Sequence, residues 1–172
     1  MNQTQILSPL LQPWSGPMGG IPPLAQVTAQ SLKDALEQGL KKAQEELDQL
    51  ICLDTLGSFN DSVLPLDQLA EGLAQVQALY ANWSSSFSSP ELRALRREFE
   101  PKLSAYHTSV YSHQGLYQRV LHAQQDDTLD AIQQRLTQRM IERFKDAGAH
   151  LSDEARTEVS EINQRLSSLF AE

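Results

Sequence analysis

The stretch Ser89-Pro-Glu-Leu-Arg-Ala-Leu-Arg-Arg-Glu-Phe-Glu-Pro-Lys-Leu-Ser-Ala-Tyr-His-Thr-Ser-Val-Tyr-Ser-His-Gln-Gly-Leu-Tyr117 decides the fold of this chain. Ser89 is a good N-cap, and Pro90 suits the first helical position, where no amide partner is needed. Gly115 breaks the pattern before a short second helix. The sequence therefore predicts a helix, a turn and a helix, and the first helix carries one apolar stripe at spacings of three and four: Leu92, Leu95, Phe99, Leu103, Tyr106 and Val110.

Similar stripes predict helices on both sides of this stretch. The first begins near Thr28 or Ser31. A later one is capped by Asp127 or Thr128, and Gly148 suits the left-handed residue past its end. The expected buried positions are Leu32, Leu36, Leu40, Ala43, Leu47 and Leu50 or Ile51 in the first helix, and Leu129, Ile132, Leu136, Met140 and Phe144 in the later one. Ser152 then caps a last helix, with Ala155, Val159, Ile162, Leu166 and Leu169 inward.

One apolar stripe runs from Phe59 to Trp83 and contains Pro65. A proline in a helix interior costs roughly 3 kcal/mol or more and bends the helix. Because the stripe keeps its phase across Pro65, we predict one kinked helix. The alternative is a helix that begins at Pro65 with an irregular lead.

Residues 1–27 differ from the rest, because they hold most of the prolines and three of the eight glycines. Proline lacks the amide that helices and sheets need, so we predict an extended arm that packs on the helical body through Leu10, Leu11, Trp14 and other apolar residues. The predicted organisation is an arm over 1–27 and a helical domain over 28–172. The fold class is all-α, a bundle of about six helices.

Composition and charge exclude several functions. A formal net charge of −8 argues against binding nucleic acid or an anionic membrane. The single cysteine, Cys52, excludes an internal disulfide, and it is interpreted as a small core residue. No signal peptide or stretch of roughly 20 apolar residues is present. We therefore expect a cytoplasmic protein.

Several pieces, in the right order, resemble the N-terminal region of the thimet oligopeptidase family of zinc metallopeptidases, which includes oligopeptidase A and dipeptidyl carboxypeptidase. They are Ser89 to Arg93, Pro101 to Ser104, Gln114 to Tyr117, the opening Ser8-Pro-Leu-Leu with Gly16 to Pro23, and Asp146 to Ser152 followed by Glu161 to Leu166. The resemblance implies that the full protein cleaves short peptides with a zinc-bound water inside a channel. It also implies that this part forms a wall of that channel and that the catalytic domain is absent.

No catalytic or metal-binding residue is carried over from the family. Its signature, His-Glu-x-x-His, places two zinc ligands one helical turn apart, and the four histidines, His107, His113, His122 and His150, never have that spacing. We predict that this chain alone holds no zinc or other cofactor and is inactive. The tyrosines Tyr106, Tyr111 and Tyr117 are interpreted as core residues.

Two further expectations follow. The alternative function is a stand-alone helical interaction module derived from such a peptidase; a novel small hydrolase has no support in the sequence. The last helix stays apolar through Leu166, Leu169 and Phe170, and contiguous apolar patches mark association sites. We therefore expect a homodimer, unless the arm covers this patch.

Overall fold

The computed structural model describes residues 7–15, 20–53, 57–87 and 89–152, together with residues 154, 155, 158, 159 and 162. The predicted all-α class is confirmed. In this part of the chain the regular structure is helical, and the extended pairing found there is one isolated bridge between Ser15 and Ile21.

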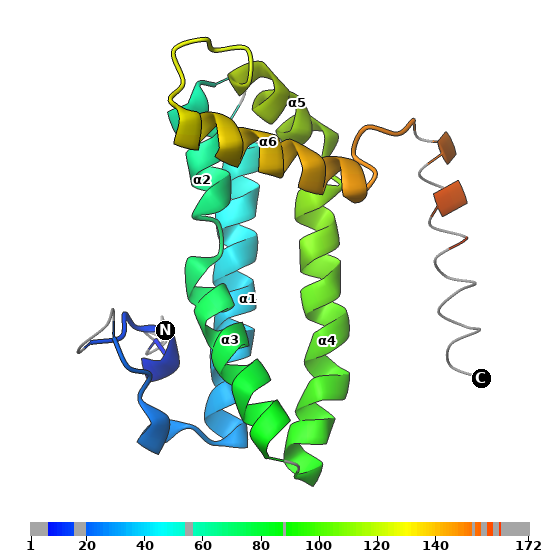
Figure 1. Ribbon diagram of the computed structural model, residues 1–172. Helices are drawn as coiled ribbons and strands as arrows, with labels where there is room; N and C mark the ends of the chain where they lie inside the picture. Colours follow the sequence, from blue (N-terminus) through cyan, green and yellow to red (C-terminus); the bar gives the residue numbers. More distant parts are fainter. Residues whose placement is uncertain are drawn as a thin grey trace, which may run out of the picture. The chain divides into compact units, whose positions relative to one another are not determined.

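The helices are α1 (Ala29–Ile51), α2 (Leu64–Asp67), α3 (Glu71–Ser86), α4 (Pro90–Tyr111), α5 (Gln114–Ala123) and α6 (Ala131–Asp146), as Figure 1 shows. Shorter elements are the 3-10 turns η1 (Pro9–Leu11) and η3 (Leu24–Gln26) and the π-helical turn η4 (Phe59–Val63). The chain forms two compact units. The first contains Met1–Asp54 and Pro65–His107, and the second contains Thr55–Leu64 and Thr108–Glu172.

The first unit is built on α1, which lies beside α3 (Figure 1). The α1 N-terminus is set by a capping box, in which Thr28 Oγ1 accepts from the Ser31 amide at 3.0 Å and Ser31 Oγ accepts from the Thr28 amide at 2.8 Å. The predicted stripe is confirmed at Leu32, Leu36, Ala43, Leu47 and Leu50, which are buried. Leu40 is half-buried.

The segment around Pro65 differs from the predicted single helix. Residues from Phe59 to Asp67 are helical, as expected, first as a π-helical turn and then as α2. The helix then stops, and Ala70 adopts a left-handed conformation with φ of 60° before α3 begins. The continuous kinked helix was therefore wrong, because the helix is interrupted at Gln68–Ala70 rather than bent at Pro65.

The described part of the N-terminal arm docks through η1, which packs on α1 and α3. Leu10 is fully buried, and the Ser8 amide donates to Gln38 Oε1 at 2.8 Å. Ile21 and Leu24 are instead exposed. Because 1–6 and 16–19 lie outside the described residues, an extended course for the whole of 1–27 stays a prediction.

The second unit packs α5 and η4 against α6. Met140 and Phe144 are buried as predicted, but Ile132 is 80% exposed. The cap predicted at Asp127 or Thr128 was wrong. Asp130 caps α6 instead, accepting from the amides of Ile132 and Gln133 at 2.8 and 2.9 Å, so Ile132 falls in the first turn and faces water.

The start of α4 and the end of α6 follow from capping chemistry. Ser89 Oγ accepts from the Leu92 amide at 3.2 Å, which confirms the predicted start of α4. Gly148 has a φ of 82° just past α6, and the Ala149 amide donates to the Phe144 carbonyl at 2.9 Å, which completes the predicted left-handed end.

The turn predicted at Gly115 lies slightly earlier. Helix α4 ends at Tyr111, and His113 is the N-cap of α5, so Gly115 lies inside the first turn. A side chain at Gly115 would meet the His113 ring at 3.1 Å. Because glycine has no side chain at this position, the ring of the capping His113 has room.

The predicted last helix is described at few positions: the Ala155 amide donates to Ser152 Oγ at 3.3 Å, while Leu166 and Leu169 lie outside the described residues.

Candidate functional site

The four histidines lie at separate places and do not make a metal centre. His113 Nδ1 accepts from the Leu116 amide at 3.2 Å, so this side chain caps α5. His107 is exposed and packs edge-on against Tyr106, and His122 and His150 are exposed. Among the described residues, no group of three or more His, Cys, Asp or Glu side chains is placed to hold a metal ion.

Cys52 is exposed, which contradicts its interpretation as a core residue. It is the C-cap of α1, one position beyond the last helical residue. The apolar stripe ends at Leu50, so the next turn faces solvent. The tyrosine interpretation is confirmed for Tyr106 and Tyr117, which are buried; Tyr111 is half-buried against Phe144, at 5.4 Å between ring centroids.

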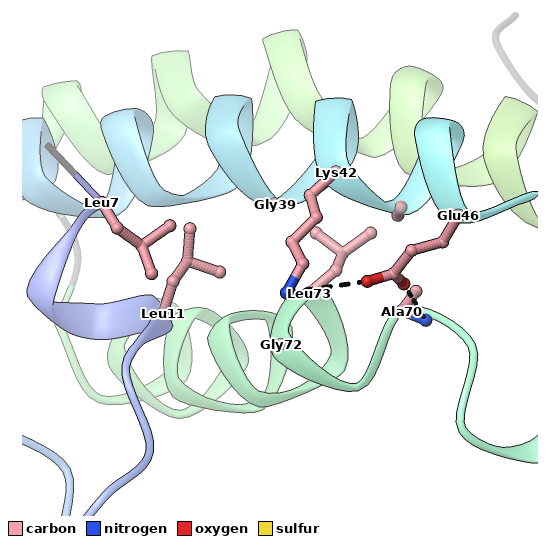
Figure 2. A pocket seen from close by; sticks show the side chains of 9 residues that line it. Leu7, Leu11, Gly39, Lys42, Glu46, Ala70, Gly72 and Leu73 are labelled. Atoms are coloured by element: carbon pink, nitrogen blue, oxygen red, sulfur yellow. Dashed lines mark hydrogen bonds and ion pairs between the residues drawn. The ribbon is translucent and has the colours of Figure 1, made fainter. Parts of the chain in front are cut away.

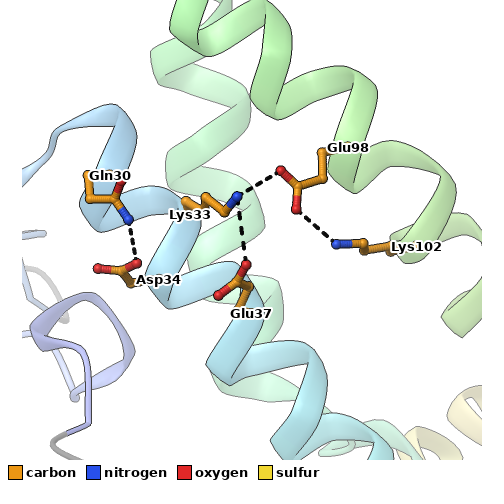
Figure 3. Close-up of polar contacts among 6 residues, drawn as sticks. All are labelled: Gln30, Lys33, Asp34, Glu37, Glu98 and Lys102. Carbon is orange, nitrogen blue, oxygen red and sulfur yellow. Dashed lines mark hydrogen bonds and ion pairs between the residues drawn. The ribbon is translucent and has the colours of Figure 1, made fainter.

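An ion-pair network joins α1 to α4 in the first unit (Figure 3). Lys33 Nζ lies 3.0 Å from Glu98 Oε2 and 3.9 Å from Glu37 Oε1, and Lys102 Nζ lies 3.0 Å from Glu98 Oε1. The two lysines hold the pKa of Glu98 below its usual value, and Glu98 raises the pKa of Lys33. Every charged group in this network has a partner of opposite charge. The network therefore links α1 to α4 and does not have the features of a catalytic acid or base.

A small notch lies where the arm meets α1 and α3 (Figure 2). Leu11 fills much of it, because Gly39 and Gly72 leave the room that a Cβ would take: an added Cβ would lie 3.3 and 3.6 Å from Leu11 Cδ2. The remaining volume is about 20 Å³, the size of one water molecule. The notch is therefore a contact between the arm and the two helices rather than a ligand site.

Glu46 borders the same notch and caps α3 from a neighbouring helix. Its Oε2 accepts from the Ala70 amide at 3.1 Å, and its Oε1 lies 3.6 Å from Lys42 Nζ (Figure 2). Ala70 has no oxygen in its side chain, so it cannot cap α3 itself. The carboxylate also places negative charge at the positive end of α3.

Glu46 also borders an open groove of about 420 Å³ in the first unit. It lies between the C-terminal end of α1 and the segment from α2 to the turn before α3. Its apolar lining is Leu50, Leu53, Pro65 and Leu69, and Glu46 and two glutamines supply polar atoms. Its volume falls within the range of ligand pockets, roughly 300–1,000 Å³, so it is the candidate binding site. No pattern in the sequence indicated it.

The comparisons with known proteins agree with the resemblance. No family model matches the chain. It is 26% identical over 165 residues to oligopeptidase A of Escherichia coli, which covers 94% of this chain and 24% of that protein. Dipeptidyl carboxypeptidase of Escherichia coli is 25% identical over 159 residues, 84% of this chain and 23% of that protein. A probable cytosolic oligopeptidase A of Arabidopsis thaliana is 26% identical over 165 residues, 94% of this chain and 23% of that protein.

The chain thus spans about a quarter of the length of the curated relatives it matches. Among its described residues, no helix is both long and apolar enough to cross a membrane. The matches extend over most of the chain rather than over one motif, as expected from the ordered pieces around Ser89 to Tyr117. This chain is therefore homologous to part of the oligopeptidase A and dipeptidyl carboxypeptidase group of peptidases.

Proposed function

We propose that this chain is the N-terminal helical part of a zinc-dependent oligopeptidase and forms a wall of the channel in which short peptides are hydrolysed. The observation that carries the proposal is the similarity to peptidases over most of this chain and about a quarter of theirs. In this proposal an arm over 1–27 precedes the helical domain over 28–172, and the full protein is cytoplasmic.

The zinc and the reacting water would belong to the part of the protein that carries His-Glu-x-x-His. The chain has no such motif, and its described histidines serve as caps or surface groups. Its own residues would shape access to the channel. Packed helices exclude a folded protein by size, while a short peptide passes in an extended conformation.

A chimera tests the proposal. The matched segment of Escherichia coli oligopeptidase A is replaced by this chain in one variant and deleted in a second. We expect the chimera to hydrolyse a quenched fluorescent peptide and to leave a folded protein intact, and the deletion to lose this selectivity or the activity. Equal rates and equal selectivity in the two variants would contradict a channel-wall role.

The isolated chain is a second test. We expect it to contain no stoichiometric zinc by elemental analysis and to hydrolyse no peptide. Turnover that co-purifies with the chain through several columns would overturn this. The alternative, a stand-alone interaction module, is distinguished by the reading frame beyond Glu172: a downstream His-Glu-x-x-His favours the peptidase, and a stop codon favours the module.

A further inference from the structure

We propose that the exposed face of α6 binds the acidic face of a partner α-helix. Arg135, Arg139 and Arg143 follow one another every four residues along α6, and all three are exposed. Residues four apart lie on the same side of a helix, one turn from each other. Because an α-helix rises 1.5 Å per residue, the three side chains form an arginine row about 12 Å long. The proposal concerns this chain alone and does not depend on its being part of a peptidase.

The arginine row has no carboxylate partner in the part of the chain that the structure describes. The ion pairs found there involve none of its three residues. Glu142 is an acid on α6 itself, but its Oε1 accepts from Gln138 Nε2 at 2.9 Å. Like charges one turn apart repel each other and weaken a helix. Carboxylates placed along the row relieve this repulsion, so charge complementarity selects an acidic partner.

Two further contacts define the ends of this face. Arg143 Nη1 donates to Tyr111 Oη at 3.5 Å, which orients the guanidinium at the C-terminal end of the row. Ile132, three residues before Arg135, is 80% exposed at the N-terminal end. Its side chain loses contact with water when it packs against an apolar side chain of the partner. The face therefore combines one apolar contact with three cations.

The length of the row favours a short acidic helix over a nucleic acid or an anionic membrane. Glutamates at every fourth position of a helix repeat every 6 Å or so, at about the spacing of the row. Both ends of α6 are acidic, since Asp130 is its N-cap and Asp146 its last residue. The whole chain carries a formal net charge of −8. A long polyanion is therefore repelled beyond the row, whereas three carboxylates on one helical face meet only the arginines.

Nuclear magnetic resonance of the isotope-labelled 172-residue chain tests the proposal. The probes are three capped, alanine-based helical peptides. The first carries one leucine and three glutamates at the spacing of 132, 135, 139 and 143; the second has glutamine for glutamate; the third has the composition of the first, with its glutamates dispersed around the helix. We expect the first to shift amide signals at 131–146 and to bind at least about fivefold more tightly than either other peptide. Raising the ionic strength to about 1 M should remove this difference.

Matched variants locate the site. Arg139→Gln removes the middle of the row, whereas Arg97→Gln removes an exposed arginine of α4. We expect Arg139→Gln to weaken the first peptide about twofold to fivefold, the range of an exposed ion pair, and Arg97→Gln to leave it unchanged. Ile132→Ser should weaken it as well. The double variant Arg135→Glu, Arg139→Glu should instead bind a version of the first peptide with lysine for glutamate.

Several results would overturn the proposal. They are the absence of any shift at millimolar peptide, shifts centred outside α6, equal effects of Arg139→Gln and Arg97→Gln, and equal binding of the peptide with dispersed glutamates. Tighter binding of an oligonucleotide or of anionic lipid vesicles would also overturn it, because the partner would then be a phosphate polyanion. A doubled mass in sedimentation that Arg139→Gln abolishes would do the same, because a second copy of the chain would then occupy the face. None of these results bears on the chimera, so the two proposals fail separately.

Discussion

Arg119 Nη2 donates a hydrogen bond of 2.7 Å to the backbone carbonyl of Asp61 in the second unit. In an α-helix that carbonyl would accept from the amide four residues later, but the residue there is Pro65, which has no N–H. Arg119 is only 6% exposed, and burial lowers the pKa of its guanidinium, against the opposing charge of Asp61. Arg119, a long side chain from α5, thus donates to a carbonyl that Pro65 could not serve in an α-helical pairing.

Replacing Arg119 with Ala should destabilise the chain by about 1.5–3 kcal/mol, the usual range for a lost hydrogen bond from a charged donor. The measurement is the free energy of unfolding in urea. The control is Arg135→Ala, an exposed arginine of α6, which should change stability by less than about 0.5 kcal/mol. If Arg119→Ala and Arg135→Ala lost the same free energy of unfolding, the hydrogen bond to Asp61 would not contribute to stability.

Replacing Ala70 with Gly should stabilise the chain by about 1 kcal/mol. Ala70 holds a φ of 60°, a conformation that costs an alanine roughly 1–2 kcal/mol and that glycine adopts readily. The matched control is Ala78→Gly on the exposed face of α3, which should destabilise by about 1 kcal/mol. The two substitutions are chemically identical, so opposite signs isolate the backbone conformation.

Replacing Glu98 with Gln should remove a pH dependence of stability. Hydrogen bonds from Lys33 and Lys102 hold the folded pKa of Glu98 below its ordinary value of 4.5. A lowered folded pKa stabilises the folded state above the unfolded pKa, and this contribution is lost as the pH falls through the folded pKa. Wild type and Glu98→Gln should therefore differ in urea midpoint at about pH 7, and the difference should shrink as the pH falls from 4.5 through the lower folded pKa.

At high pH the same ion pair makes the stability of the folded chain decrease as the pH rises. Glu98 raises the pKa of Lys33 above its ordinary 10.5, so that contribution is present below this value and is lost as the pH rises through the folded pKa. The control is Glu37→Gln, which removes only the 3.9 Å contact to Lys33. It should follow the wild-type pH profile. A difference in urea midpoint between wild type and Glu98→Gln that does not shrink at all as the pH falls below 4.5 would contradict the assignment.

The self-association predicted from the last apolar stripe can be tested by light scattering. Leu169 and Phe170 lie outside the described residues, while Val159 and Ile162, earlier in the stripe, are exposed. We expect light scattering across a concentration series to show a dimer, and replacement of Leu169 and Phe170 by Glu to return the monomer. A monomer at every concentration in both proteins would rule out association through this stripe.

Element type was predictable from the sequence because helical periodicity is a local property. The stripe of α1 and the cap at Ser89 were predicted correctly for this reason. Element boundaries were less predictable. Asp127, Thr128 and Asp130 all have oxygens that can cap a helix, and only the folded geometry shows that Asp130 accepts from two amides. Likewise, nothing local shows that Glu46 caps α3 across a gap in the sequence.

The sequence by itself determined the helical class, the absence of the catalytic motif from this chain and the kinship with peptidases, because these depend on the order of residues alone. Only the tertiary structure decided the break at Ala70, the outward position of Cys52 and the groove. The groove joins Leu50 and Leu53 at the end of one helix to Pro65 and Leu69 in the next segment. Side chains distant in the sequence make a common surface only when packing brings their helices together, and no local pattern records that contact.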